Sequence, residues 1–341
     1  MIRIFTIHHK LEWISYVQKA AEYDFYHTWH YHTLETGGAP ILVVYQEHDD
    51  FIGIPLLRRT IPGSEFFDLS CVYGYTGPFS NKKIEELDES LMGNFKRAFL
   101  QFLSDEKYVS VFIRMHPFFK QQLLLKEFGG VHENGLTVVI DLSLSIEAQR
   151  ERYRQSTMDA VKHARKRGFV IKDEKHREAV AVFVNIYQET MKRVGASDYY
   201  LFNEDYFVRI LNTNEYDARL LTVYDGDEAI CSTIVTFTNG IIQAHLLGTR
   251  AEYLHHSPSK FLADEISIIG RSAGMRYYNL GGGLGFKEDA LFKWKLGFTD
   301  LCLPYKSWRY VANPCAYQEL LAKKNIDKNS DIDFFPLYRY V

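Results

Sequence analysis

The dipeptide Asn239-Gly240 constrains the fold of this chain most strongly, because it is a strong signal for a two-residue β-hairpin turn. The apolar runs on either side of it, Ala229–Thr238 and Ile241–Gly248, predict the two paired strands. A second turn at Asp225-Gly226-Asp227 predicts one more antiparallel strand before them. A helix is expected ahead of that strand, over Arg177–Arg193. Ser257-Pro258 then predicts a helix, with serine as the N-cap and proline in the first turn. An antiparallel meander that leads into a helix predicts an α/β domain.

The first half of the sequence predicts a similar order of elements. Helices, a β-hairpin, a helix and a further strand are expected in turn, at 11–35, 41–57, 82–103 and 109–115, and another helix is expected at 118–128. Single hydrophobic cores stop growing beyond about 250–300 residues. Since this chain has 341 residues, we expect two domains, 1–145 and 146–341, with the boundary near residues 143–147. The similar order suggests that one α/β unit is duplicated.

Charge, hydropathy and cysteine spacing exclude several classes of protein. With 40 basic and 43 acidic residues, the chain lacks the overall basic charge expected of a duplex-DNA-binding protein. No apolar run reaches about 18 residues and the start of the chain has no signal-peptide pattern, so we expect no membrane span and a cytoplasmic location. The four cysteines are widely separated and the histidines lack metal-ligand spacing, so we expect reduced thiols and no metal site.

A basic stretch early in the predicted second domain is a candidate phosphate-binding surface. Residues 147–167 are expected to form one helix that ends at Gly168, and they include seven basic and three acidic residues. Four of the basic residues would share one ridge of this helix: Arg150, Arg154, Lys162 and Lys166. Such a ridge either holds the phosphates of a nucleotide, a coenzyme or an RNA, or is an ordinary solvated helix face.

Two further segments are candidate sites. Ser257, Ser259 and Lys260 surround a predicted helix start, where backbone N–H groups and an ammonium can bind an anion; the alternative is a simple helix cap. The loop Gly281-Gly282-Gly283 would let a ligand approach the backbone, but it matches no nucleotide-binding motif. The segment Leu291–Phe298 behind this loop alternates apolar and cationic residues, and a lysine at its buried edge can stabilise a developing anion.

These segments together resemble the FemAB family of peptidyltransferases and their GNAT-like acyltransferase relatives. The most specific part is the glycine loop followed by Leu291-Phe292-Lys293-Trp294-Lys295-Leu296-Gly297-Phe298. Weaker similarities at 29, 40–45, 51–57, 164–169, 187–190 and 274–280 extend the resemblance over nearly the whole chain. The resemblance implies an α/β fold of two tandem GNAT-type domains with mixed, largely antiparallel sheets, and transfer of an acyl group to an amine.

The resemblance also implies roles for particular residues. The family's catalytic aromatic–lysine pair falls on Trp294 and Lys295, with tryptophan in place of the usual phenylalanine. The substrate-contacting tyrosine falls on Tyr206, and an aromatic residue of the central strand falls on His245, where histidine replaces tyrosine.

Three parts of the family's pattern are missing. The arginine that holds a precursor's diphosphate has no clear equivalent in residues 198–205, and no inserted helical arm is expected after Phe169. The coenzyme A loop typical of GNAT enzymes is also absent before Ser259. These departures leave the donor and the acceptor open.

The leading hypothesis is an N-acyltransferase that transfers an aminoacyl group from charged tRNA to an amine, with a cell-envelope precursor as one candidate acceptor. One alternative is an acyl-CoA-dependent N-acetyltransferase acting on a sugar, peptide or envelope metabolite, and another is an inactive binding module of the same fold. No tightly bound cofactor is expected. Lys295 would stabilise the oxyanion or guide the leaving hydroxyl, while Tyr206, His245 or a water chain would take the proton of the amine.

The remaining candidate residues are assigned to the two substrates. In the second domain, a group of residues would hold the donor phosphates: Arg154, Lys162, Ser257, Ser259 and Lys260. The glycine loop 281–283 would bring backbone amides close to the substrate. In the first domain, Tyr73 and Tyr75 belong to an aromatic loop suited to the acceptor, or else to a packed surface loop.

Overall fold

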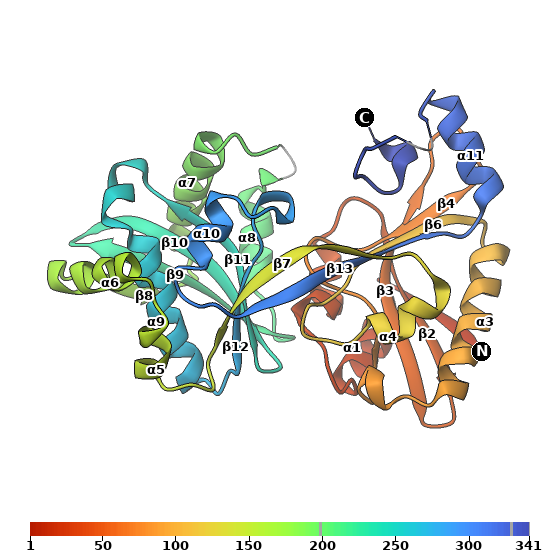
Figure 1. Ribbon diagram of the computed structural model, residues 1–341, viewed down its shortest axis with the longest axis horizontal. Coiled ribbons are helices and arrows are strands. Elements are labelled where there is room, and N and C mark those ends of the chain that lie inside the picture. Colours follow the sequence, from red (N-terminus) through yellow and green to blue (C-terminus); the bar gives the residue numbers. More distant parts are fainter. Residues whose placement is uncertain (198–199, 328–329, 341) are drawn as a thin grey trace. The chain divides into compact units, whose positions relative to one another are not determined.

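The computed structural model describes residues 1–197, 200–327 and 330–340. The chain forms two compact units, which are called unit 1 (Met1–Gly135 with Pro304–Val341) and unit 2 (Leu136–Leu303). This division differs from the predicted domains 1–145 and 146–341. The reason is that strand β13 (Cys302–Val311) pairs antiparallel with β6 (Tyr108–Arg114), which returns the end of the chain to unit 1 (Figure 1).

Unit 1 contains a mixed sheet with the strand order β1-β2-β3-β4-β6-β13, and β5 lies beside β3. Its remaining elements are β1 (Ile2–Thr6), α1 (Lys10–Gln18), α2 (Trp29–Thr33), β2 (Ala39–Glu47), β3 (Asp50–Thr60), β4 (Phe67–Ser70), β5 (Phe79–Ser80), α3 (Glu89–Asp105), α4 (Gln122–Leu125) and α11 (Pro314–Lys323). The β4–β6 pair is parallel. Helix α3 contributes Phe95 and Phe99 to a core that also buries Trp308 of β13 completely.

A buried carboxylate fixes the C-terminal segment to unit 1. Asp68 is fully buried and accepts hydrogen bonds from the Tyr338 hydroxyl at 2.9 Å and from Nε of Arg339 at 2.5 Å. Its other oxygen accepts from Nε of Arg59 at 2.7 Å. Residues near the end of the described chain are therefore part of the interior of unit 1.

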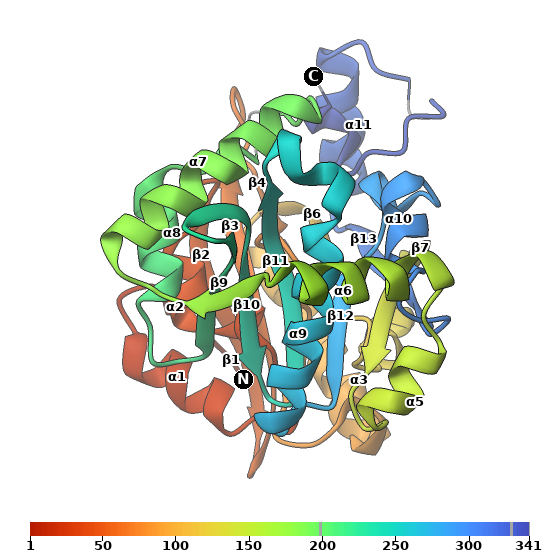
Figure 2. The ribbon, with the colours of Figure 1, turned by 90° about the vertical axis from the view of Figure 1, so that its left-hand side faces the viewer.

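The strands of unit 2 have the order β7-β12-β11-β10-β9-β8 and include both parallel and antiparallel pairs. Its elements are β7 (Val131–Asp141, which begins in unit 1), α5 (Ile146–Glu151), α6 (Gln155–Arg167), β8 (Val170–Asp173), α7 (Arg177–Arg193), α8 (Glu204–Leu211), β9 (Asp217–Asp225), β10 (Glu228–Thr238), β11 (Ile241–Thr249), α9 (Pro258–Ser272), β12 (Tyr277–Gly281) and α10 (Ala290–Lys295). Figure 2 shows α6 and α9 in front of the strands of this unit. These two helices share a core cluster with β9 to β12, so the sheet and the helices form one α/β layer pair.

Most local predictions for unit 2 are confirmed. Asn239 and Gly240 both have positive φ, 46° and 82°, and connect β10 to β11 as an antiparallel hairpin. Helix α7 has the predicted bounds, and α9 begins at Pro258.

In unit 1 the helix predicted over 118–128 is wrong in length, because only α4 and a following 3-10 turn form there. Among the described residues, no helix is long and apolar enough to cross a membrane.

The single helix predicted over residues 147–167 is wrong. The chain leaves the helical path at Arg152–Arg154, because the backbone N–H of Arg154 donates to the carbonyl of Gly297 at 2.9 Å. The break separates α5 from α6, so Arg150 does not continue the ridge of Lys162 and Lys166. The predicted end of the helix is confirmed, since Gly168 has φ 86° in the left-handed region.

Two helices, α7 and α8, lie between β8 and β9. Helix α7 was predicted and α8 was not; the two contact each other, and α7 packs against β10 and β11. The expectation that no helical arm follows Phe169 is therefore wrong, because α7 and α8 follow β8 in the chain. Phe183 of α7 and Phe207 of α8 are completely buried, which ties both helices to the body of unit 2.

Candidate active site

The glycine loop of unit 2 is held by two charged side chains. Nζ of Lys295, at the end of α10, donates to the carbonyl oxygen of Gly282 at 2.6 Å. Asp289, the N-cap of α10, accepts from the backbone N–H groups of Phe292 at 2.8 Å and Leu284 at 2.9 Å. Position 283 must be glycine, because a Cβ there would lie 2.0 Å from the Lys287 carbonyl oxygen. The loop is thus folded back on the helix that carries the predicted catalytic lysine.

Burial changes the acid–base behaviour of Lys295. Desolvation lowers the pKa of its ammonium to about 8, and the nearby Asp289 carboxylate partly opposes this shift. A lysine with a pKa near 8 can both carry a proton and release one close to neutral pH. Its neighbour Trp294 is half-buried and packs edge-on against Phe298, with ring centroids 5.2 Å apart. Trp294 therefore forms part of the apolar support for this loop.

A second pair of candidate residues meets on β11 and α8. The hydroxyl of Tyr206 and Nε2 of His245 are 2.9 Å apart, so the sequence-predicted pair is brought into direct contact. His245 is the bulged residue of β11, because Ile234 pairs with Leu246 and Val235 pairs with Ala244. Burial lowers the pKa of His245 to about 3, so its ring is neutral at physiological pH.

The Tyr206–His245 pair and the Lys295–Gly282 pair lie beside the place where β11 and β12 stop pairing, which is called the fork. Strands β11 and β12 are parallel, and their last described pair is Gln243 with Asn279. His245 and Gly281 each lie two residues beyond this pair, which corresponds to roughly 7 Å of extended chain. The Asn279 side chain supports the fork: its amide donates to Gln243 at 2.8 Å and its oxygen accepts from the Gly281 N–H at 3.0 Å. Gly281, with φ 76°, then turns the chain into the loop.

Three of the predicted phosphate-binding residues, Arg154, Lys162 and Lys260, lie on α6 or next to its start. Nη1 of Arg154 donates to the Lys293 carbonyl at 3.1 Å, and Nζ of Lys260 lies 3.3 Å from the Ser156 carbonyl at the start of α6. Desolvation and then the Arg154 charge lower the pKa of Lys260. Lys162 is exposed on α6, further along the helix than Arg154 and Ser156.

The predicted phosphate site at the start of α9 differs from expectation. Ser257 is the N-cap by position, but its φ of 51° is left-handed and its side chain makes no capping hydrogen bond. Pro258 has no N–H, and the N–H of Lys260 is donated to the Ser257 carbonyl. Ser259 is half-buried in the first turn. This helix start therefore offers few backbone donors to an anion.

The basic ridge is partly used for structure. Asp264 of α9 is fully buried and accepts from Arg150 at 2.7 Å, from Arg165 at 2.8 Å and from the Tyr153 hydroxyl at 2.9 Å. The prediction that Arg150 belongs to a phosphate-binding surface is not supported by this placement. The network joins α5 and α6 to α9.

In unit 1, the predicted acceptor residues lie in a loop that is firmly packed. Tyr75 is 8% exposed and packs edge-on against Tyr26 and Tyr305. The carbonyl oxygen of Tyr73 accepts a hydrogen bond from the Tyr31 hydroxyl at 3.0 Å. A role of Tyr73 and Tyr75 in acceptor binding stays a prediction.

Two residues of the site were missed from the sequence. Asp289 stands three residues before Phe292 at the start of α10, so an N-cap pattern was available to find it. Asn279 had no such signal, because its partner Gln243 is 36 residues away. No cluster of three or more His, Cys, Asp or Glu side chains suited to a metal is found among residues 1–197, 200–327 and 330–340.

Removing the Tyr206 hydroxyl tests the Tyr206–His245 pair. We expect Tyr206→Phe to lower acceptor-dependent kcat/KM about tenfold, the scale of one lost hydrogen bond. The matched control is Tyr224→Phe on β9, outside the fork, which should keep wild-type kcat/KM. Equal rates for the two variants would remove Tyr206 from the site.

Comparisons with known proteins identify the domain family and the fold. Residues 151–295 match the acetyltransferase (GNAT) domain family. The crystal structure of FemX matches with a TM-score of 0.72 and 13% identity over 94% of this chain and 99% of that chain. The structure of L-PGS from Bacillus licheniformis matches with a TM-score of 0.59 and 12% identity over 93% of this chain and 96% of that chain.

A third solved structure is the C-terminal domain of a putative lysylphosphatidylglycerol synthetase from Agrobacterium fabrum. It has a TM-score of 0.54 and 13% identity, over 83% of this chain and 88% of that chain. A search of curated protein sequences finds no match. Residues 151–295 therefore match a GNAT acetyltransferase domain, and the chain shares the FemAB-like GNAT fold of FemX; the domain match supports an acyltransferase.

Proposed function

We propose that unit 2 transfers an aminoacyl group from charged tRNA to an amine at the fork between β11 and β12. The observation that carries this proposal is the Lys295 ammonium 2.6 Å from the Gly282 carbonyl oxygen, where the glycine loop leaves β12. The Tyr206–His245 pair stands at the corresponding level of β11. A polar pair and an ammonium on the two branches of the fork suit a reaction in which an amine attacks a carbonyl carbon.

The chemistry needs alignment more than activation. The amine nitrogen bonds to the ester carbonyl carbon, the carbonyl electrons move to oxygen, and collapse of this intermediate breaks the bond to the ribose oxygen. The amine loses one proton and the leaving oxygen gains one. Alignment can contribute about 7–11 kcal/mol, and a positioned charge on the oxyanion about 3 kcal/mol.

Lys295 can stabilise the oxyanion while it keeps its hydrogen bond to the glycine loop. An ammonium has three donors, so one can stay on the Gly282 carbonyl oxygen while another reaches the oxyanion or the leaving oxygen. His245 is neutral and hydrogen-bonded to Tyr206, so it is suited to accept the proton of the attacking amine, either through the Tyr206 phenol or through a water molecule. The acceptor amine is proposed to belong to a cell-envelope precursor.

An RNA donor is supported by the placement of the cations. Arg154, Lys162 and Lys166 lie on or beside α6, in an exposed row suited to a phosphate backbone. A coenzyme diphosphate would need free backbone N–H donors at the start of α9. There, Pro258 has no N–H, and the N–H of Lys260 already donates to the Ser257 carbonyl. One structural neighbour is named a putative lysylphosphatidylglycerol synthetase, and the product in that name is a lipid that carries an aminoacyl group.

The acyl-CoA alternative has its own support. The GNAT acetyltransferase domain match covers the fork, the glycine loop and Lys295. In that case the leaving group is a thiolate, and Lys260 at the start of α9 would face the phosphates of the coenzyme.

Parallel titrations with charged tRNA and acetyl-CoA at two salt concentrations separate the donors. We expect saturable tRNA binding that weakens steeply with salt, and a further loss in Arg154→Glu and Lys162→Glu. The control is Lys324→Glu, an exposed lysine at the end of α11. Coenzyme binding without tRNA binding would overturn the tRNA proposal, and tRNA binding without deacylation in the presence of amines would favour the inactive binding module.

A further inference from the structure

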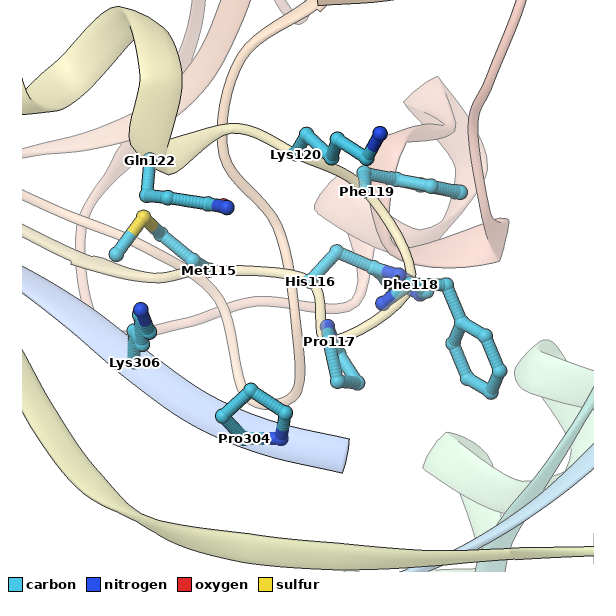
Figure 3. Close-up of a pocket in the computed structure, with 9 residues that line it drawn as sticks. All are labelled: Met115, His116, Pro117, Phe118, Phe119, Lys120, Gln122, Pro304 and Lys306. Carbon is cyan, nitrogen blue, oxygen red and sulfur yellow. Dashed lines mark hydrogen bonds between the residues drawn. The ribbon is translucent and has the colours of Figure 1, made fainter. Parts of the chain in front are cut away.

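Unit 1 contains a cavity of about 200 Å³ at the end of β6 (Figure 3). Its walls come from Met115, from residues 116–120 and 122 that follow it, and from Pro304 and Lys306 of β13. All of these residues belong to unit 1, so the cavity is formed within one unit. A cavity of about 150 Å³ holds a benzene molecule, so this one has room for a molecule of amino-acid size.

The walls of the cavity are fixed by buried hydrogen bonds. Nε2 of His116 and Oδ2 of Asp24 are 2.8 Å apart, and both side chains are fully buried. The His116 backbone N–H donates to the Gln121 side-chain oxygen at 2.8 Å, and the Met115 N–H donates to the Lys306 carbonyl at 2.9 Å. The cavity is therefore preformed, which lowers the ordering cost of binding.

The charge of the lining selects the kind of ligand. Lys120 and Lys306 are the two lysines in the lining, and none of the lining residues is an aspartate or a glutamate. Figure 3 shows the Lys306 ammonium and the Gln122 amide on one side, with the rings of Pro117 and Pro304 across from them. Lys306 is only 24% exposed, and its partner Glu133, 3.1 Å away, is 78% exposed. Such an exposed partner is held weakly, so an incoming anion can replace it.

We propose that this cavity binds a small organic carboxylate. The carboxylate would pair with Lys306, and the apolar body would lie against Met115, Pro117 and Pro304. The other lysine of the lining, Lys120, already has the Glu85 carboxylate 3.4 Å away. Both a free carboxylic acid and the C-terminal end of a peptide have this chemistry. The inference does not depend on the acyl transfer proposed for unit 2.

Amide NMR of the full chain tests the proposal with N-acetylvaline, its uncharged primary amide and isovalerate as probes. We expect N-acetylvaline to bind with a Kd of about 1 mM or tighter. The largest shifts should fall in residues 115–122 and 304–306. The neutral amide should bind at least about tenfold more weakly, because it lacks the charge that pairs with the ammonium.

Variants place the carboxylate at Lys306. Lys306→Gln should weaken binding about tenfold, Lys306→Arg should restore it, and Lys324→Gln at the end of α11 should match the wild type. Isovalerate bound as tightly as N-acetylvaline supports a site for free acids, and tighter binding of N-acetylvaline supports a peptide end. Equal binding of acid and amide, shifts outside these residues, or an unchanged Kd in Lys306→Gln would overturn the proposal.

Discussion

Replacing Lys295 with methionine is expected to lower turnover about 10²–10³-fold, the usual loss when one oxyanion-stabilising donor is removed. The methylene stem is kept, and burial already disfavours the lysine charge, so we expect the protein to stay folded. The matched control is Lys293→Met, an exposed lysine two residues earlier on the same helix. The measurement is the rate of donor deacylation in the presence of amines, together with the thermal unfolding midpoint.

The lowered pKa of Lys295 gives this prediction a pH signature. If its ammonium acts in the reaction, turnover falls as pH rises through about 8, where the proton is lost. Stability changes in the opposite direction. In the unfolded chain the lysine pKa is 10.5, so the unfolded state binds more protons between about 8 and 10.5, and the Lys295 contribution to stability rises over that range.

Lys295→Arg separates chemistry from structure in this test. Arginine stays charged throughout the range, so the falling limb near pH 8 should move to higher pH in that variant. Wild-type turnover in Lys295→Met, or a falling limb that does not move in Lys295→Arg, would remove Lys295 from the reaction.

Asp264→Ala is expected to destabilise unit 2 by about 3–5 kcal/mol, because it leaves buried partners without their carboxylate. Asp264 is fully buried, and it joins α5, α6 and α9 through Arg150, Arg165 and Tyr153. Burial and the Asp264 charge raise the pKa of Tyr153, so the phenol stays a donor.

Glu265→Ala is the control for Asp264→Ala. Glu265 is the next residue, also pairs with Arg165 and is partly exposed, so we expect a loss below about 1 kcal/mol. Urea unfolding of both variants, monitored by far-UV circular dichroism, gives the two free energies. Similar losses in the two variants would show that the network around Asp264 contributes no more than a surface ion pair.

The sequence predicts local features of this molecule well. The Asn239-Gly240 hairpin, helix α7 and the glycine loop before α10 each depend on neighbouring residues, and all three form where predicted. The contact between Tyr206 and His245 joins residues that were singled out by resemblance to a family, since nothing in the spacing pairs them.

The features that were missed depend on distant partners. The break between α5 and α6 follows a hydrogen bond from Arg154 to Gly297, and the return of β13 to unit 1 follows its pairing with β6. Arg150 looks like a surface cation until Asp264, 114 residues later, is placed beside it. Helix periodicity carries no information about such contacts.

The return of β13 to unit 1 also sets an order of assembly during protein synthesis. Residues 136–303 leave the ribosome as one continuous stretch, so unit 2 has all of its residues before translation ends. Unit 1 must wait, because Asp68 pairs with Arg59 early in the chain but gains its other two partners only when Tyr338 and Arg339 have been made. For most of synthesis the first 135 residues therefore expose a surface that the last part of the chain will cover, which makes this half the one in need of protection from aggregation.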